Sequence, residues 1–278
     1  MKKISRRSFL AAAGLSVAAL ALTACGGSAS SVASSVASSA SSAAASTSAA
    51  AGELTTVEAG KLTMATNAAF PPYEMTTDAG EFEGIDIETA QAIADKLGLE
   101  LQIDDMDFDA ALLSVQQGKA DIVMAGVTVT DERKAVMDFS DSYATGIQSI
   151  IVPEGSDIAS PDDLAGKKIG TQRGTTGYIY CSDDFGDDNV VAYDDGLTAV
   201  QALNNGQVDA VVIDNAPAKE FVAANPGLVI LDTSYAEEDY AIGMAKGSSL
   251  EDAVNATLEE LKADGTLQAI VDKYITAE

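Results

Sequence analysis

The fold follows from one stretch near the middle of the chain, Ala120-Asp121-Ile122-Val123-Met124-Ala125-Gly126-Val127-Thr128-Val129-Thr130-Asp131-Glu132-Arg133-Lys134. Its first half is a short apolar run, which indicates a buried strand over residues 120–125. The chain therefore leaves the carboxyl end of a strand at Gly126. Open α/β sheets bind their ligands at that edge, so this turn is the first candidate for a site.

The polar groups after this strand suit a small zwitterion. Gly126 allows the backbone to approach a ligand closely, and Thr128 and Thr130 offer hydroxyl groups. Arg133 supplies a planar guanidinium that matches a carboxylate. Together these groups can hold both ends of an amino acid. The same residues also fit a plain turn followed by a charged helix start on the surface, and the spacing alone leaves both interpretations open.

Composition narrows the classes of chemistry. The chain has 278 residues, long enough for two compact domains, no histidine, and only two cysteines, Cys25 and Cys181. Without histidine the usual general base and most zinc sites are excluded, so we predict no metal and no cofactor. A formal charge of −27 argues against nucleic acid as a partner of the folded part.

The first 53 residues indicate export and a tether. Residues 1–25 pair a basic start with an apolar segment over 9–22 that is too short to span a membrane, as in a signal peptide. Leu22-Thr23-Ala24-Cys25 resembles a lipoprotein box, which would make Cys25 the lipidated residue. Ser5-Arg6-Arg7-Ser8-Phe9-Leu10 resembles a twin-arginine signal, and the export route stays open. Residues 26–53 are built almost entirely of small residues and predict a disordered tether with a reach of roughly 30 Å.

The remainder alternates strand and helix patterns. A strand over 61–66, a helix over 85–97 ended by Gly98, a strand over 99–103, and a helix capped by Asp109 and closed by Gly118 precede the opening strand. Similar units follow over 167–214, and two amphipathic helices end the chain at 250–261 and 267–275. The pattern predicts an α/β protein with helices covering a largely parallel sheet.

One segment is repeated. Gly118 to Gly126 matches Gly206 to Asp214, with the order glycine, aspartate and apolar strand recurring 88 residues later. Gly126 and Asp214 are then equivalent, and two facing units would present them from opposite sides of a ligand. A buried Asp214 needs a cation, which a ligand ammonium would supply. Alternatively, Asp214 pairs with Arg133 in an empty cleft, or the repeat only reflects how common helix-glycine-strand units are.

Three motifs in order carry a family resemblance: Phe70-Pro71-Pro72-Tyr73-Glu74, Gly84-Ile85-Asp86-Ile87-Glu88 and Gly126 to Arg133. They resemble the amino-acid-binding family (family 3) of ABC-transporter extracellular solute-binding proteins, and the similarity runs from about Lys61 to Tyr274. The resemblance implies a two-domain, periplasmic-binding-protein-like (type II) α/β fold with a ligand cleft and a two-strand hinge. Lobe 1 would comprise 54–147 and 241–278, and lobe 2 would comprise 148–240.

The resemblance also assigns site residues. Positions matching Arg133 and Thr176 take the ligand carboxylate, and those matching Gly126, Thr128 and Asp214 take its amino group. Phe70 and Phe108 match aromatic walls, as Tyr73 does more weakly, although from sequence alone core packing is the better interpretation of the two phenylalanines. Asn67 and Gln172 match positions that reach the ligand side chain.

These last positions suggest what the ligand is. Family members specific for basic amino acids commonly have an acid at the position of Asn67. Two neutral amides instead favour an uncharged polar ligand such as glutamine or cystine. Asp109, beside Phe108, is the one acid that could reach the pocket if it does not cap the helix.

The resemblance implies a receptor rather than an enzyme. It would be a monomer held by lipid on the outer face of the cell membrane, extracellular or periplasmic, delivering an amino acid to the permease subunits of an importer. The alternative is a cyclohexadienyl (arogenate or prephenate) dehydratase-like enzyme on the same fold. A sensing domain is a weaker option, because no signalling segment accompanies the chain. Cys181 is expected to be a structural or idle thiol.

Overall fold

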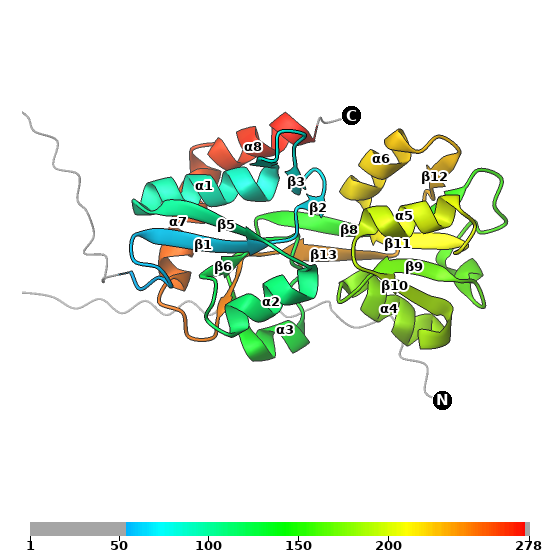
Figure 1. Cartoon of the computed structure of the whole chain (residues 1–278), viewed down its shortest axis with the longest axis horizontal. Helices are drawn as coiled ribbons and strands as arrows, with labels where there is room; N and C mark the ends of the chain where they lie inside the picture. The colour runs from blue at the N-terminus through cyan, green and yellow to red at the C-terminus, as the bar shows by residue number, and fades with distance from the viewer. Residues whose placement is uncertain (1–53, 276–278) are drawn as a thin grey trace, which may run out of the picture. The chain divides into compact units, whose positions relative to one another are not determined.

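The structure is a computed structural model that describes residues 54–275. The predicted signal peptide, Cys25 and the tether lie outside these residues. The described part is a mixed α/β fold whose sheets and helices fall into two lobes (Figure 1). No helix within it is long and apolar enough to cross a membrane.

The first lobe is built around a five-stranded sheet in the order β5-β1-β6-β14-β7. These strands are β1 (Lys61–Thr66), β5 (Glu100–Asp105), β6 (Ile122–Val123), β7 (Met137–Phe139) and β14 (Gly243–Ala245). A small sheet of β2 (Ala69–Phe70), β3 (Glu74–Thr76) and β4 (Phe82–Glu83) lies beside it. The helices of this lobe are α1 (Ile85–Leu97), α2 (Phe108–Gln116), α3 (Asp131–Val136), α7 (Glu251–Ala263) and α8 (Thr266–Tyr274).

The second lobe has a six-stranded sheet in the order β10-β9-β11-β8-β12, with β13 also paired to β8. Its strands are β8 (Ala144–Pro153), β9 (Ile169–Gln172), β10 (Val190–Tyr193), β11 (Ala210–Asp214), β12 (Leu228–Ile230) and β13 (Ala236–Tyr240). Three helices pack on it: α4 (Thr176–Phe185), α5 (Gly196–Asn204) and α6 (Asn215–Ala224). β11 is buried throughout and β8 is buried from Gln148 to Val152, which fits their runs of valine and isoleucine.

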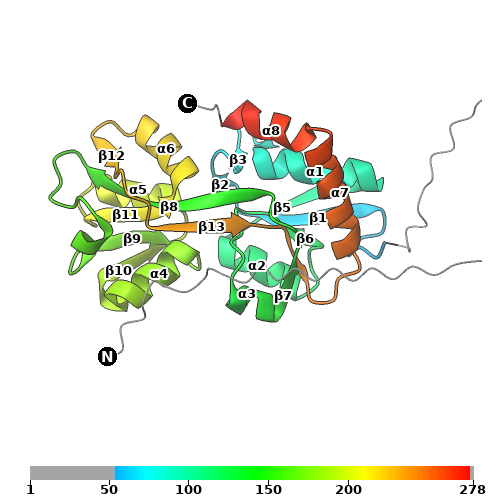
Figure 2. The same cartoon turned by 180° about the vertical axis from the view of Figure 1, so that it is seen from behind.

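Two long strands carry the chain from one lobe to the other. β8 and β13 run antiparallel, with Ala144 opposite Tyr240 and Gln148 opposite Ala236, and they lie side by side in Figure 2. Just beyond β13 the chain contacts the first lobe, because Val129 N donates to Asp239 O (3.0 Å) and Ala241 N donates to Val127 O (3.1 Å). The ligand turn predicted at Gly126 is therefore fixed directly to a crossing strand.

The internal repeat has matching local geometry in both lobes. Gly118 (φ 65°) and Gly206 (φ 66°) end α2 and α5 in the left-handed conformation that glycine adopts without strain. Three residues later Asp121 accepts from Thr63 N (2.8 Å), and the equivalent Asp209 accepts from Lys168 N (2.8 Å). The repeated aspartate thus fixes the start of a strand to the neighbouring strand. Gly126 and Asp214 follow at equivalent places.

Two local predictions differ from the structure. Asp109 does not cap its helix: α2 begins at Phe108, which buries its ring, so the capping position falls to Asp107 and Asp109 lies in the first turn. The strand expected over 120–125 forms a ladder only at β6, although the flanking residues are buried.

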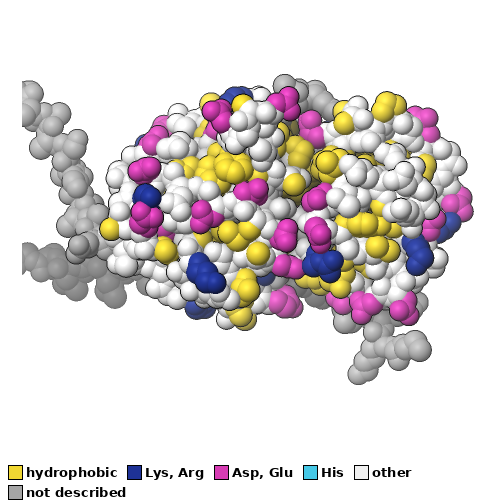
Figure 3. Space-filling view, in the orientation of Figure 1, with side chains coloured by type: hydrophobic (Ala, Val, Ile, Leu, Met, Phe, Trp, Pro, Cys, Tyr) yellow, Lys and Arg dark blue, Asp and Glu magenta, His cyan; other side chains and the backbone are white. Residues whose placement is uncertain are grey.

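The net negative charge is spread over the surface. Acidic side chains are scattered across both lobes on the face in Figure 3 and are more abundant there than basic ones, as the composition of 43 acids against 16 bases requires.

Candidate ligand pocket between the lobes

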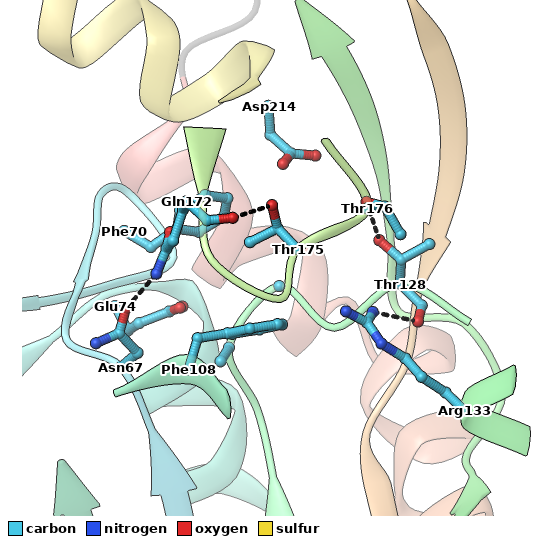
Figure 4. A pocket seen from close by; sticks show the side chains of 12 residues that line it. Asn67, Phe70, Glu74, Phe108, Thr128, Arg133, Gln172, Thr175, Thr176 and Asp214 are labelled. Carbon is cyan, nitrogen blue, oxygen red and sulfur yellow. Dashed lines mark hydrogen bonds between the residues drawn. The ribbon is translucent and has the colours of Figure 1, made fainter. Parts of the chain in front are cut away.

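A pocket with about 320 Å³ of empty space lies where the two lobes meet. Both lobes contribute side chains, which point toward a common centre in Figure 4. The residues that line it are Asn67, Phe70, Glu74, Phe108, Ala125, Gly126, Thr128, Arg133, Gln172, Thr175, Thr176 and Asp214.

One end of the pocket is suited to an anion. The buried Arg133 guanidinium donates to Thr128 O (2.8 Å) and to Gly174 O (3.2 Å) of the other lobe, which leaves further N–H groups for a ligand. The guanidinium carbon of Arg133, Cζ, lies 5.3 Å from the centre of the Phe108 ring. Burial lowers the pKa of Arg133, and nearby acids, Glu238 first, oppose that change. The amino end of α4 begins at Thr176, and its free N–H groups and dipole also favour an anion.

The opposite charge lies at Asp214. This carboxylate ends β11, is buried, and accepts from Gln148 Nε2 (2.8 Å) and from the Tyr240 hydroxyl. Burial raises the pKa of Asp214 from 3.8 to about 7, and the neighbouring charge of Glu238 adds to the shift. A ligand cation would remove much of that penalty, because it would stabilise the ionised form.

Gly126 is fixed by close packing. It has φ 54°, and a Cβ there would lie 2.8 Å from Cε1 of Phe70, so no larger residue fits. Its N–H donates to Asp86 Oδ2 (3.0 Å), which holds the turn against the first lobe. The chain can therefore bring backbone close to a ligand here.

The third part of the pocket is neutral and aromatic. Gln172 Nε2 donates to Asn67 Oδ1 (2.8 Å), so these two amides join the lobes. Asn67 Nδ2 in turn donates to Met106 O (3.0 Å). Phe70 and Phe108 belong to the hydrophobic cores, and their side chains also line the pocket.

Every residue predicted to contact a ligand lines this pocket except Tyr73 and Thr130, whose hydroxyl instead caps α3 by accepting from Arg133 N (3.2 Å). Tyr73 stacks on Phe70 (ring centroids 5.9 Å apart) and packs edge-on against Tyr240 (5.3 Å). It lines a different pocket, shared with Asp214 and Tyr240. Asp109 is also absent from the lining, and its carboxylate lies against Gly174, where a Cβ would be only 1.7 Å from Asp109 Oδ1.

Glu74 was not predicted as a site residue. It belongs to the motif that begins at Phe70, but sequence gives no reason to place it in a pocket. The side chain is fully buried, and burial together with the charge of Asp86 raises its pKa well above 4.5. Burial therefore favours the neutral form of this carboxyl group. Asp86 is also buried, and burial raises its pKa to about 6, although hydrogen bonds, that from Gly126 N–H first, oppose the change.

The comparisons with known proteins agree with this architecture. The model of the bacterial extracellular solute-binding proteins, family 3, matches residues 62–277. The L-cystine-binding protein TcyJ of Escherichia coli (strain K12) is 33% identical over 80% of this chain and 85% of its own length. The arginine-binding extracellular protein ArtP of Bacillus subtilis (strain 168) is also 33% identical, over 78% of this chain and 87% of its own length.

A solved structure agrees at the level of the whole fold. An ancestral arginine-binding protein bound to glutamine has a TM-score of 0.75 and 41% identity, and the match covers 78% of this chain and 99% of that one. The match of the family model over nearly all of the described residues, with residues of the first and third motifs lining one pocket between two lobes, shows that the chain belongs to family 3 of the bacterial extracellular solute-binding proteins.

Proposed function

We propose that this protein captures an L-amino acid between its lobes and delivers it to the permease of an ABC importer. One observation carries the proposal: a single pocket places Arg133 and the amino end of α4 on one side and Asp214 on another. The first pair suits an α-carboxylate and Asp214 suits an α-ammonium. The names of the relatives support the same class of ligand.

We further propose that the ligand has an uncharged polar side chain, with glutamine or cystine as the best candidates. Asn67 and Gln172 offer hydrogen bonds without a fixed negative charge, and burial disfavours the charged form of Glu74. A cationic side chain would have to ionise the buried Glu74 to gain a counter-ion, and the desolvation of that carboxylate would offset part of the benefit. An aliphatic one would leave polar groups unpaired, at roughly 1–3 kcal/mol each.

A thermal-shift screen of the twenty amino acids and L-cystine tests both proposals, followed by titration calorimetry. A ligand at a hundred times its Kd stabilises the protein by about 2.7 kcal/mol, which such a screen detects readily. No response to any amino acid contradicts the proposed class. If arginine binds at least tenfold tighter than every neutral amino acid, the class stands but the preference is wrong.

The parts outside the pocket belong to the same proposal. Residues 1–25 are a signal peptide, Cys25 carries lipid, and 26–53 tether a monomer to the outer face of the membrane. Lobe 1 comprises 54–147 and 241–278, and lobe 2 comprises 148–240. The family is one of extracellular proteins, which supports this location.

A dehydratase-like activity is the second candidate. Such an activity requires a general acid in the cleft. Asp214, with a pKa of about 7, has that property. The relatives that we found are binding proteins, which favours the receptor. Incubation with arogenate or prephenate should give no aromatic product, and a product that disappears with Asp214→Asn would establish the enzyme instead.

A further inference from the structure

Three donors converge on one oxygen just behind the pocket. Glu238 Oε2 accepts from Thr176 Oγ1 (2.8 Å), Gln148 Nε2 (3.1 Å) and Thr128 Oγ1 (3.2 Å). The two threonines come from different lobes, and both line the pocket, whereas Glu238 does not. Glu238 is 7% exposed and projects inward from β13, between the outward residues Glu237 and Asp239.

The positions of the hydroxyl protons follow from this arrangement. A carboxylate can only accept, and each threonine hydroxyl has a single proton to donate. If both protons point at Glu238, the 3.5 Å contact between the two hydroxyl oxygens, drawn in Figure 4, is not a hydrogen bond. The two hydroxyl oxygens then present only lone pairs to the pocket.

We propose that Glu238 is a positioning residue that turns the Thr128 hydroxyl into an acceptor for the ligand's α-ammonium. This inference rests on the proposed function. It also means that the Thr176 hydroxyl has no proton left for the ligand carboxylate. That carboxylate must be held by Arg133 and by the backbone N–H groups at the start of α4.

The surrounding contacts support this role. Gln148 Nε2 donates to Asp214 Oδ2 as well as to Glu238, so one amide holds both acids beside the ammonium end of the pocket. β13 fixes the backbone on both sides, because Glu238 lies opposite Gly146 of β8 and the next inward residue, Tyr240, bridges to Thr128. Glu238 is therefore held in place independently of any ligand.

A double-mutant cycle tests the inference, with affinity for the amino acid that binds the wild type most tightly, L-glutamine by our expectation. Any amino acid serves as the probe, because the inference concerns the α-ammonium alone. Glu238→Gln keeps the shape but removes the acceptor-only group, and Thr128→Val removes the hydroxyl. Each should weaken binding at least fivefold. The double variant should bind within threefold of the weaker single variant, since both remove the same interaction.

Two controls separate positioning from a general disturbance. Glu237→Gln makes the same charge change at the neighbouring exposed position and should leave affinity within threefold of wild type. A second cycle pairs Glu238→Gln with Gln172→Ala at the other end of the pocket, and there the losses should multiply. Unfolding midpoints without ligand report whether each variant folds. If Glu238→Gln does not fold, Glu238→Asp replaces it, because aspartate keeps the charge but shortens the side chain.

The inference is overturned by a loss below fivefold for Glu238→Gln, or by losses that multiply with Thr128→Val. Failure of the proposed function looks different, because the wild type itself would then bind no amino acid.

Discussion

At the scale of single residues, Arg133 is the group on which capture of an α-carboxylate should depend most. Arg133→Ala would leave a buried anion without its partner and should weaken binding by about 3–5 kcal/mol. Arg133→Lys should fail as well, because one ammonium cannot replace a fork that also reaches the carbonyls of Thr128 and Gly174. Calorimetry measures both, and an Arg133→Ala affinity within threefold of wild type would contradict the assignment.

Asp214 predicts how binding depends on pH. In the empty pocket its pKa is about 7, and a ligand ammonium beside it should lower that value. The bound state then holds fewer protons, so affinity should fall as pH decreases below about 7, by up to about tenfold per pH unit. Calorimetry in buffers of different ionisation enthalpy should detect proton release near pH 6.5. Asp214→Asn should bind more weakly and lose this pH dependence, and an unchanged dependence in that variant would assign it to another acid such as Asp86.

At the scale of elements, the crossing strands have little tolerance at Gly146. A Cβ there would lie 2.4 Å from a ring carbon of the buried Tyr240, although the backbone itself would accept alanine. Gly146→Ala should therefore destabilise the protein by about 1–3 kcal/mol, measured by urea unfolding without ligand. Thr145→Ala, on the exposed side of the same strand, should change stability by less than about 0.5 kcal/mol. Equal effects of the two substitutions would mean that Tyr240 moves aside freely.

The elements also show what sequence can and cannot predict. α1 was predicted with its bounds because apolar spacing and a terminal glycine, Gly98, both mark it. The helix cap at Asp109 was wrong because burial of the Phe108 ring, a tertiary effect, moves the start of α2. Nine of the twelve residues that line the pocket were predicted, largely from family resemblance and from the repeat that pairs Gly126 with Asp214. Glu238 could not be found that way, because it lies 110 residues from Thr128 and 62 from Thr176.

At the scale of the whole molecule, ligand should compact the protein. Arg133 to Gly174 and Asn67 to Gln172 are contacts between lobes that an open form would lack, and a ligand held from both sides favours the closed form. X-ray scattering should show a smaller radius of gyration on adding a tightly bound amino acid. Superimposable curves with and without that ligand would argue against hinge closure.

The proposed lipid anchor at Cys25 leads to a separate prediction for the intact chain. Cys25→Ala should release the protein from the membrane fraction, with no change in ligand affinity, because the pocket lies wholly within the described residues. Cys181 should not substitute for it, since that thiol is buried in α4 and burial raises its pKa to about 12. Persistent attachment of the Cys25→Ala protein would indicate an uncleaved leader that acts as an anchor.

The hydrogen bond between Asn67 and Gln172 has a consequence for transport as a whole. It joins two side chains of the lobes directly, so part of the free energy of closure comes from the lobes themselves and not from a ligand. An empty receptor that closes can occupy a permease and deliver nothing. At low nutrient levels such unproductive encounters would compete with productive ones, and the ratio of closed empty to closed loaded receptors would set the lowest concentration at which uptake is efficient. A substitution that weakens this amide pair, such as Gln172→Ala, would then lower the affinity for the ligand and also lower the fraction of receptors that are closed and empty.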